Sequence, residues 1–564
     1  MEKHLSGGGL LLLALKKAGV DYFFINSGTE YAALLIDYQQ MKRSDRPEMV
    51  VSLHESTAVS AACGYGLKSD KPCAVLVHTV PGVTNSLSNL LNAFSARIPL
   101  ILVSGVTPFS NQGYAGSKNI RVHWGQDVRN IQEIVRQFVK WDYLIKSVDE
   151  IPSAVARALE ISIMSPEGPV YIGIYREWLM MKAGEQFKAP KPTPVSKPAP
   201  DPSSVKQVVE KLLEAEYPVV LTRSAGRWVE NVELLVRLAE LVGCRVSLPV
   251  GDYVNFPTTN PFSAQFKLSD ADFILAVEND VPWIPSGESP RDDAYKIYVS
   301  TDPLMTNYGV WGFSFDKAIQ SHSKLFLEAV VKELEKSKQY LKKDVVEERR
   351  AKAFEDWTSE KKARDREVES DFRYGILTKR LASHILGQVV SKNTVIVNEY
   401  SLRPEYLVFE SAGTYFGEPP AGALGWGLGA ALGIKLAEPD RDVVVVVGDG
   451  SYVFNNPVSA HCMSLWYSLP ILVVILNDGR WGDVKRSILD SGLYSSFEDV
   501  NKLEGVDFPM AIDFYGLAQG LGLEGYNVDE VSMLKGVLSK AFATVKSGKP
   551  AVVDVKISSR ASLV

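Results

Sequence analysis

Two acidic residues that each follow an apolar run are the first candidates for chemistry. Val443–Val447 is a run of five valines, and a Gly-Asp-Gly turn containing Asp449 follows it. Ile471–Leu476 is a second apolar run, and Asp478 comes two residues after it. Short runs of this kind predict buried parallel strands. Because the carboxyl ends of parallel strands meet at one edge of a sheet, we expect the two carboxylates to lie close together and to offer oxygens to Mg²⁺.

Polar residues also end the predicted strands near the N-terminus. Thr29, Glu55 and His78 each lie at or just after the end of an apolar run. Strands that alternate with helices predict an α/β fold with doubly wound parallel sheets. We therefore expect these three side chains along one edge of a first sheet. The first-domain strands are predicted at Tyr22–Ile25, Met49–Leu53, Ala74–Val77 and Leu100–Val103.

The chain is too long for one core, and we predict three such parallel-sheet domains. They cover residues 1–187, 205–335 and 375–564. The proline-rich segment 188–204 predicts an extended linker, and the charged segment 333–370 predicts a solvated helical connector.

Composition narrows the class of protein. With 46% hydrophobic and 23% charged residues, the 564-residue chain is typical of a soluble globular protein. A net charge of −6 gives no basic surface for nucleic acid. Four scattered cysteines without a CxxC pair argue against disulfides or zinc, so we expect a cytoplasmic location. No run approaches the ~20 apolar residues of a membrane span, and Leu10–Leu15 predicts a helix with core-facing leucines.

The spacing between the two acidic loops carries the first resemblance. A lone Gly-Asp-Gly is most simply a turn, but 26 residues, Ser451 to Leu476, separate it from Asn-Asp. This pattern resembles the thiamine diphosphate (ThDP) motif, in which Asp478 would replace a second asparagine. The resemblance implies metal ligation by Asp449, Asp478 and the Arg480 carbonyl. It also implies diphosphate contacts from the Gly450 and Ser451 amides, in a loop ahead of a helix expected over Ser459 to Ser468.

Glu55 is similar to a second element of the ThDP enzymes. It lies in VSLHESTAVSAACGYG, at the end of a strand and the start of a small-residue helix. By itself it fits a glutamate favoured by the helix dipole. The resemblance implies that Glu55 hydrogen-bonds the pyrimidine ring of the cofactor and drives its activation.

Two further segments match cofactor contacts of the family. YFGEPPAGALGWGLGAALGIKLAEPDR, residues 415–441, predicts a tightly packed Gly/Ala helix. In the family such a segment bends the cofactor, which implies Leu424 as the wedge and the Gly422 carbonyl as a pyrimidine contact. The NEYS segment resembles the diphosphate segment of benzoylformate decarboxylases, although a plain asparagine turn fits it equally. Its candidate contacts are Asn398, Ser401 and the amide of Leu402.

Over nearly its whole length the chain resembles the ThDP-dependent decarboxylase and acetolactate synthase superfamily. This implies a pyrimidine-binding, a central and a diphosphate-binding domain. It also implies a site shared between subunits of a dimer or tetramer.

The active-site residues mix features of two relatives. HTVPGVTN, which begins at His78, is similar to benzoylformate decarboxylases, as is NSGTE, with Thr29 in the place of a substrate-binding serine. Gln126 matches an active-site glutamine of acetolactate synthases. His78 and Gln126 are therefore candidates for proton transfer and orientation, although His78 could be a strand-end histidine bonded to backbone. The decarboxylases' second histidine has no clear match, with His123 a weak substitute, and the stretch typical of bound FAD is missing.

We therefore expect a ThDP- and Mg²⁺-dependent enzyme that acts on a 2-oxo acid. The electron-sink chemistry of ThDP implies decarboxylation to an aldehyde, carboligation with an aldehyde acceptor to a 2-hydroxy ketone, or both. An acetolactate synthase-type carboligase and a non-catalytic protein of the same fold are the alternatives. A flavin- or nucleotide-binding protein is disfavoured, because no GxGxxG follows a strand.

Overall fold

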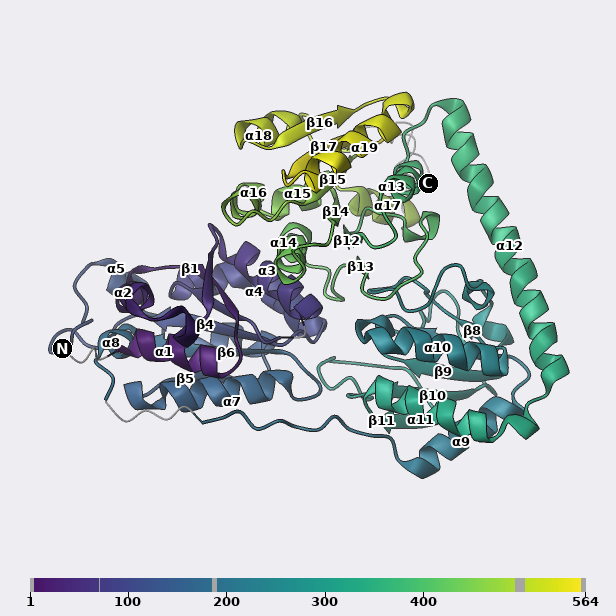
Figure 1. Ribbon diagram of the computed structural model, residues 1–564, viewed down its shortest axis with the longest axis horizontal. Coiled ribbons are helices and arrows are strands. Elements are labelled where there is room, and N and C mark those ends of the chain that lie inside the picture. Colours follow the sequence, from purple (N-terminus) through teal and green to yellow (C-terminus); the bar gives the residue numbers. More distant parts are fainter. Residues whose placement is uncertain (1–4, 70, 185–189, 492–502, 559–564) are drawn as a thin grey trace. The chain divides into compact units, whose positions relative to one another are not determined.

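The computed structural model describes residues 5–69, 71–184, 190–491 and 503–558. Within these residues the chain forms three parallel sheets with helices on their faces, which confirms the predicted fold class (Figure 1). The chain forms two compact units. One comprises Met1–Val195, Glu418–Asn527 and Lys540–Val555, and the other comprises Ser196–Gly417, Val528–Ser539 and Lys556–Val564. The predicted domain boundaries stay predictions.

The first sheet positions the N-terminal candidate residues. Its six strands are, in spatial order, β2 (Glu48–Val51), β1 (Tyr22–Asn26), β3 (Ala74–Val77), β4 (Leu100–Val106), β6 (Pro169–Tyr175) and β5 (Asp142–Leu144). All neighbouring pairs are parallel. The accompanying helices are α1 (Gly7–Lys17), α2 (Ala32–Gln40), α3 (Glu55–Ser69), α4 (Val80–Ser95), α5 (Val122–Gly125), α6 (Gln132–Val135), α7 (Ile151–Ile163) and α8 (Arg176–Met180).

The N-terminal leucines fill the core of this sheet, as predicted. Leu11, Leu12 and Leu15 of α1 are fully buried. Helix α1 ends at Lys17, and Gly19 follows with φ of +88°, a left-handed conformation that favours glycine at a helix end. Burial of these leucines contributes roughly 1.5–3 kcal/mol each.

The second sheet has five parallel strands and a long helical segment after it. Their order is β11 (Lys317–Gln320), β10 (Tyr295–Ser300), β9 (Phe273–Val277), β7 (Pro218–Thr222) and β8 (Arg245–Val246). The helices are α9 (Pro202–Glu214), α10 (Val229–Val242), α11 (Ser323–Lys336) and α12 (Lys343–Tyr374). Helix α12 is the single long rod of Figure 1 and matches the predicted charged connector. Residues 190–201 have no regular structure, as expected of the proline-rich linker.

The third sheet has six strands and carries the acidic loops. The strands are β12 (Val395–Glu399), β13 (Tyr415–Phe416), β14 (Val443–Gly448), β15 (Leu472–Asn477), β16 (Glu524–Val528) and β17 (Ala551–Lys556). Strands β14 and β15 are parallel neighbours, in a register that pairs Gly448 with Leu476. The helices are α13 (Lys379–Val389), α14 (Gly427–Ala437), α15 (Asp449–Phe454), α16 (Pro457–Trp466), α17 (Gly482–Asp490), α18 (Phe514–Gly520) and α19 (Val531–Lys546).

One local prediction at the acidic loop is wrong. Gly450 and Ser451 were expected in a loop ahead of the helix, but both lie in the first turn of α15. Asn456, with φ of +48°, separates α15 from α16, and α16 is the helix that was predicted over Ser459 to Ser468. Helix α15 was missed because its six residues carry no helical repeat of apolar positions.

Helices α3 and α14 pack with almost no side chains between them. A Cβ atom at Gly433 would lie 1.9 Å from the carbonyl oxygen of Ala61, and a Cβ at Gly64 would lie 2.0 Å from that of Ala430. Glycine is thus required at both positions, because any other residue would separate the two backbones. The predicted close packing of the Gly/Ala helix is confirmed.

No helix within the described ranges combines the length and the apolar character that crossing a membrane requires.

Several strands, including β6 and β16, are not predicted from the sequence because they are short or interrupted by glycine.

The close contact of α3 and α14 predicts that an added methyl group changes the free energy of unfolding differently at Gly433 than at an exposed helix glycine. Gly433→Ala should lower the free energy of unfolding by about 1–3 kcal/mol, because the backbone of α3 cannot yield without repacking. Gly536→Ala is the matched control, since Gly536 is an exposed helix glycine with open space around it. The control should raise stability by about 0.5–1 kcal/mol. The midpoint of thermal unfolding is measured for both variants. Equal changes of the midpoint in the two variants would contradict the packing argument.

Candidate active site

The structure brings the two acidic loops into direct contact. Asp449 is the first residue of α15, directly after β14, and its side chain is 3% exposed. Its Oδ2 accepts a hydrogen bond from the Gly479 amide at 2.7 Å, and its Oδ1 accepts one from its neighbour Gly450 at 2.9 Å. Asp478 immediately precedes Gly479. The expected proximity is therefore present, and ligation of a metal there stays a prediction.

The donors at this loop suit a hard cation. No group of three or more His, Cys, Asp or Glu side chains suited to a metal occurs in the part of the chain that the structure describes. Two carboxylates alone leave most of an octahedron to backbone carbonyls, waters and phosphate oxygens, which is how Mg²⁺ is commonly held. These residues therefore fit Mg²⁺ bound together with a diphosphate, and not a self-sufficient protein cage.

The side chain of Arg480 interacts with protein groups next to the acidic loop. Its Nε donates to the Asp478 carbonyl at 3.0 Å and lies 3.3 Å from the Asp507 carboxylate. The buried Lys485 ammonium lies 3.8 Å from the same carboxylate. A guanidinium cation does not ligate a metal, so the predicted ligand at Arg480 is its backbone carbonyl.

Close packing explains the glycine after Asp449. A Cβ atom at Gly450 would lie 2.3 Å from the ring of Trp481. That indole packs edge-on against Phe508 and Phe454, with ring centroids 5.2 and 5.9 Å apart. The Gly-Asp-Gly turn is thus shaped by contact with the second acidic loop as well as by the end of β14.

Glu55 begins helix α3 and is held by helix α4. Its carboxylate is largely buried, at 7% exposure, and its Oε2 accepts a hydrogen bond from Asn85 Nδ2 at 3.2 Å. One turn further along α4, Asn89 donates to Ser56 Oγ at 2.8 Å and to the Gly425 carbonyl at 2.9 Å. Asn89 therefore links the start of α3 to the segment before α14.

Asn92 hydrogen-bonds both backbone groups of one residue in that same segment. Its Oδ1 accepts from the Ala423 amide at 3.1 Å, and its Nδ2 donates to the Ala423 carbonyl at 2.8 Å. Gly422, the predicted pyrimidine contact, and Leu424, the predicted wedge, flank Ala423. Gly422 has φ of +63°, so it turns the chain in a conformation that favours glycine. We did not anticipate the α4 asparagines, although their spacing of four and three residues places them on one helix face.

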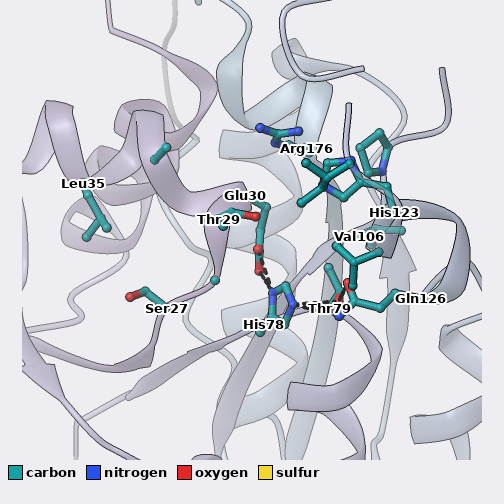
Figure 2. Close-up of a pocket in the computed structure, with 15 residues that line it drawn as sticks. Ser27, Thr29, Glu30, Leu35, His78, Thr79, Val106, His123, Gln126 and Arg176 are labelled. Carbon is teal, nitrogen blue, oxygen red and sulfur yellow. Dashed lines mark hydrogen bonds and ion pairs between the residues drawn. The ribbon is translucent and has the colours of Figure 1, made fainter. Parts of the chain in front are cut away.

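Thr29, His78 and Gln126 line one cavity of about 400 Å³ (Figure 2). Glu30 joins them and is missing from our predicted residues. Its carboxylate contacts His78 Nδ1 at 2.8 and 3.0 Å, and on the opposite side of the ring His78 Nε2 lies 3.2 Å from Gln126 Nε2. Thr79 Oγ1 donates to Gln126 Oε1 at 3.1 Å. His78 is thus held by side chains, and the alternative of a backbone-bonded histidine does not apply.

The Glu30 carboxylate favours the protonated form of His78. Glu30 is 2% exposed, and its hydrogen bond to the imidazole raises the pKa of His78 above its usual value, although burial of the ring acts in the opposite direction. The charge of Glu55 raises it further. A Cβ at Gly82 would contact both Glu55 Oε1 and His78 Cβ at 3.3 Å, so Glu55 and His78 both adjoin Gly82.

The predicted NEYS contacts lie in the other compact unit. Asn398 Oδ1 accepts from the Leu402 amide at 2.9 Å, and Asn398 Nδ2 donates to the Tyr415 hydroxyl at 2.9 Å. Ser401 is buried. This is the asparagine-stabilised turn that we named as the alternative, so the diphosphate roles of Asn398, Ser401 and Leu402 stay predictions.

Comparison with known proteins identifies the family of this chain. The family model of the thiamine pyrophosphate enzyme N-terminal TPP binding domain matches residues 5–134, and that of the C-terminal TPP binding domain matches residues 402–555. The acetolactate synthase large subunit of Buchnera aphidicola subsp. Acyrthosiphon pisum is 24% identical, over 98% of this chain and 95% of its own. Benzoylformate decarboxylase of Pseudomonas aeruginosa is 25% identical, over 96% of this chain and 97% of its own.

Solved structures share the fold. A ThDP-dependent 4-hydroxybenzoylformate decarboxylase from Rhodococcus jostii RHA1 superimposes with a TM-score of 0.75 at 20% identity, covering 98% of this chain and 99% of that one. Benzoylformate decarboxylase from Polynucleobacter necessarius gives a TM-score of 0.76 at the same identity and coverage. Both TPP-binding domains, the full-length relatives and the shared three-sheet fold place this chain in the ThDP-dependent decarboxylase and acetolactate synthase superfamily.

Proposed function

We propose that this protein is a ThDP- and Mg²⁺-dependent enzyme that breaks or forms a carbon–carbon bond on a 2-oxo acid. The observation that carries the proposal is the hydrogen bond from the Gly479 amide to Asp449, because it joins the two acidic loops. A pair of carboxylates at the carboxyl ends of adjacent parallel strands suits a metal-bound diphosphate. When bound, ThDP supplies a carbon nucleophile and an electron sink for loss of CO₂.

Each group of residues has one task in this proposal. Asp449, Asp478 and the Arg480 carbonyl hold Mg²⁺, and the amides of Gly450 and Ser451 donate to the diphosphate. Glu55 donates or accepts a hydrogen bond at the pyrimidine ring, and the buried position of its carboxylate strengthens that bond. Gly422 and Leu424, held through Ala423 by Asn92, position the ring. Asn398, Ser401 and Leu402, in the other compact unit, stay candidate diphosphate contacts on the resemblance of their segment alone.

His78 is the proposed proton donor in the cavity. Because the pKa of His78 is raised by Glu30, a larger fraction of the imidazole is protonated near neutral pH than in an isolated histidine. Gln126 and Thr79 hold the ring from the opposite side, and Thr29 lines the wall that faces substrate. A protonated histidine there can deliver a proton to a product carbon or alkoxide.

The same arrangement serves two outcomes. Proton delivery by His78 favours release of an aldehyde, whereas entry of an aldehyde acceptor into the 400 Å³ cavity leads to a 2-hydroxy ketone. We place decarboxylation first because of the Glu30–His78 pair, and acetolactate synthase-type carboligation second because of Gln126. A non-catalytic role is disfavoured, since Glu55 and both acidic loops are present together. Self-association as a dimer or tetramer and a cytoplasmic location remain part of the proposal.

The overall proposal is tested by CO₂ release. The full-length protein with ThDP and Mg²⁺ should release CO₂ from at least one of pyruvate, a branched-chain 2-oxo acid and benzoylformate, and chelation of the metal should stop it. Adding an aldehyde acceptor in parallel reports carboligation. A protein that binds ThDP yet turns over none of these acids would count against catalysis.

Glu55→Gln tests cofactor activation. The substitution keeps the size and the Asn85 contact but removes the carboxylate. Turnover should fall by about 10²–10⁴-fold while ThDP affinity and the unfolding midpoint stay near wild type. Glu133→Gln, an exposed change, is the control. Wild-type turnover in Glu55→Gln would refute the assignment.

Asp449→Asn and Asp478→Asn should differ in their effect on Mg²⁺-dependent ThDP binding. Asp449→Asn removes a buried carboxylate and should weaken Mg²⁺-dependent ThDP binding by on the order of tenfold or more. Asp478→Asn restores the residue usual in the family and keeps an oxygen donor, so binding should persist. Calorimetric titration of ThDP at several Mg²⁺ concentrations separates the two variants. Equal loss in both would contradict the proposed ligand set.

Glu30→Gln should shift the pH dependence of activity. The negative Glu30 favours protonated His78, so its removal lowers the pKa of His78. If protonated His78 is the required form, the high-pH limb of the kcat/KM profile moves to lower pH in Glu30→Gln. Asp149→Asn, on the exposed surface, should leave the profile in place. An unmoved limb in Glu30→Gln would assign that limb to another group.

A further inference from the structure

Two side chains of the cavity are unused by the proposed reaction. Arg176 follows β6 as the first residue of α8, and His123 lies in α5 with 4% of its surface exposed. Both line the same cavity as His78. In Figure 2 Arg176 lies above Glu30 and His78 lies below it, while His123 lies to the right, above Gln126. The cavity therefore has two polar ends, of which only the His78 end is assigned.

One residue organises Arg176 and His123. The Asn119 side-chain oxygen accepts a hydrogen bond from Arg176 Nη1 at 3.2 Å, and the Asn119 amide donates to His123 Nδ1 at 3.2 Å. Because Nδ1 accepts this bond, the neutral ring carries its proton on Nε2 and is a donor there. Burial and the nearby Arg176 lower the pKa of His123, which favours this neutral form.

The Arg176 charge is not neutralised by the protein. Among the described residues no carboxylate pairs with it, and its Nε is buried without a hydrogen-bond partner. Two acids lie nearby, and neither forms an ion pair with Arg176 within the described residues, although Glu177 Oε2 is itself buried without a hydrogen-bond partner. Glu30 pairs with His78, and Glu177 Oε1 accepts from the amide and hydroxyl of Ser110 at 2.9 and 2.6 Å. Nε is enclosed by protein, and Nη1 also donates to the Gly116 carbonyl at 3.5 Å. Among the described residues no partner is found for Nη2, so this donor of the cavity-lining guanidinium is suited to a carboxylate oxygen.

Apolar side chains also line this cavity. Leu35, Val106, Pro108 and Ile120 line the cavity. They offer nothing to a polar substrate chain but would pack against methylene groups. A ligand that matches the whole cavity therefore has an oxo acid at one end, a short aliphatic stretch and an anionic group at the other end.

We infer that Arg176 and His123, aligned by Asn119, bind a second anionic group of the substrate, so that the preferred 2-oxo acids carry a carboxylate at the far end of their side chain. This inference rests on the proposed function for the reacting end. The anion-binding end is a property of the cavity alone and can be measured without turnover.

Binding of unreactive acids tests the Arg176 end directly. Glutarate and pentanoate have the same chain length and differ in one carboxylate. Calorimetric titration of the full-length protein, with and without ThDP and Mg²⁺, should give glutarate on the order of tenfold tighter binding. Arg176→Met should abolish the difference, and Asn119→Ala should reduce it. Arg129→Met, which removes an exposed arginine of the same segment, should preserve it.

Turnover then separates this inference from the proposed function. With 2-oxoglutarate and 2-oxopentanoate as a matched pair, wild type should favour the diacid at least tenfold in kcat/KM, and Arg176→Met should lose that preference. Equal binding of glutarate and pentanoate, or equal losses for both acids in Arg176→Met, would overturn the inference. If Arg176-dependent glutarate binding occurs but no 2-oxo acid is consumed, the proposed function fails and the anion site stands.

Discussion

The contact on which the site depends is the close approach of α3 and α14, secured by the asparagines of α4. Gly64 and Gly433 allow the two helix backbones to meet. Asn89 then bonds the start of α3 and the Gly425 carbonyl together, and Asn92 holds Ala423 by both its amide and its carbonyl. Glu55 and the segment that contains Gly422 are therefore fixed relative to each other by buried hydrogen bonds, which are strong where water is excluded. Without that contact, two segments more than 350 residues apart in the chain would have no defined separation.

Charge is distributed over the site in separate compartments. Asp449 and Asp478 concentrate negative charge where a cation is proposed, while Arg480 and Lys485 turn toward Asp507. In the cavity, Glu30 is balanced by His78, and Arg176 has no acidic partner among the residues that the structure describes. A buried charge that the protein does not compensate is costly unless a ligand compensates it. For this reason we propose the metal beside Asp449 and Asp478 and the substrate anion beside Arg176.

Much of the fold could be predicted because buried parallel strands leave a strong mark on a sequence. Val443–Val447 and Ala74–Val77 are apolar throughout, and both are strands. The acidic turn after β14 and the glutamate at the start of α3 followed from their positions at strand ends. The short helix α15 and the strand β6 were missed, since six residues or a glycine-broken run give too little periodicity.

The sequence alone determined the three parallel sheets, the family, and which residues end their strands, because apolar runs and turn spacing are local properties of the chain. Only the tertiary structure showed that Glu30 pairs with His78, that α4 presents Asn85, Asn89 and Asn92 to two other segments, and that Asn119 aligns Arg176 with His123. These pairings join side chains whose separation in sequence bears no relation to their distance. They arise from the crossover order of the strands and the burial of each pair, which no local pattern records.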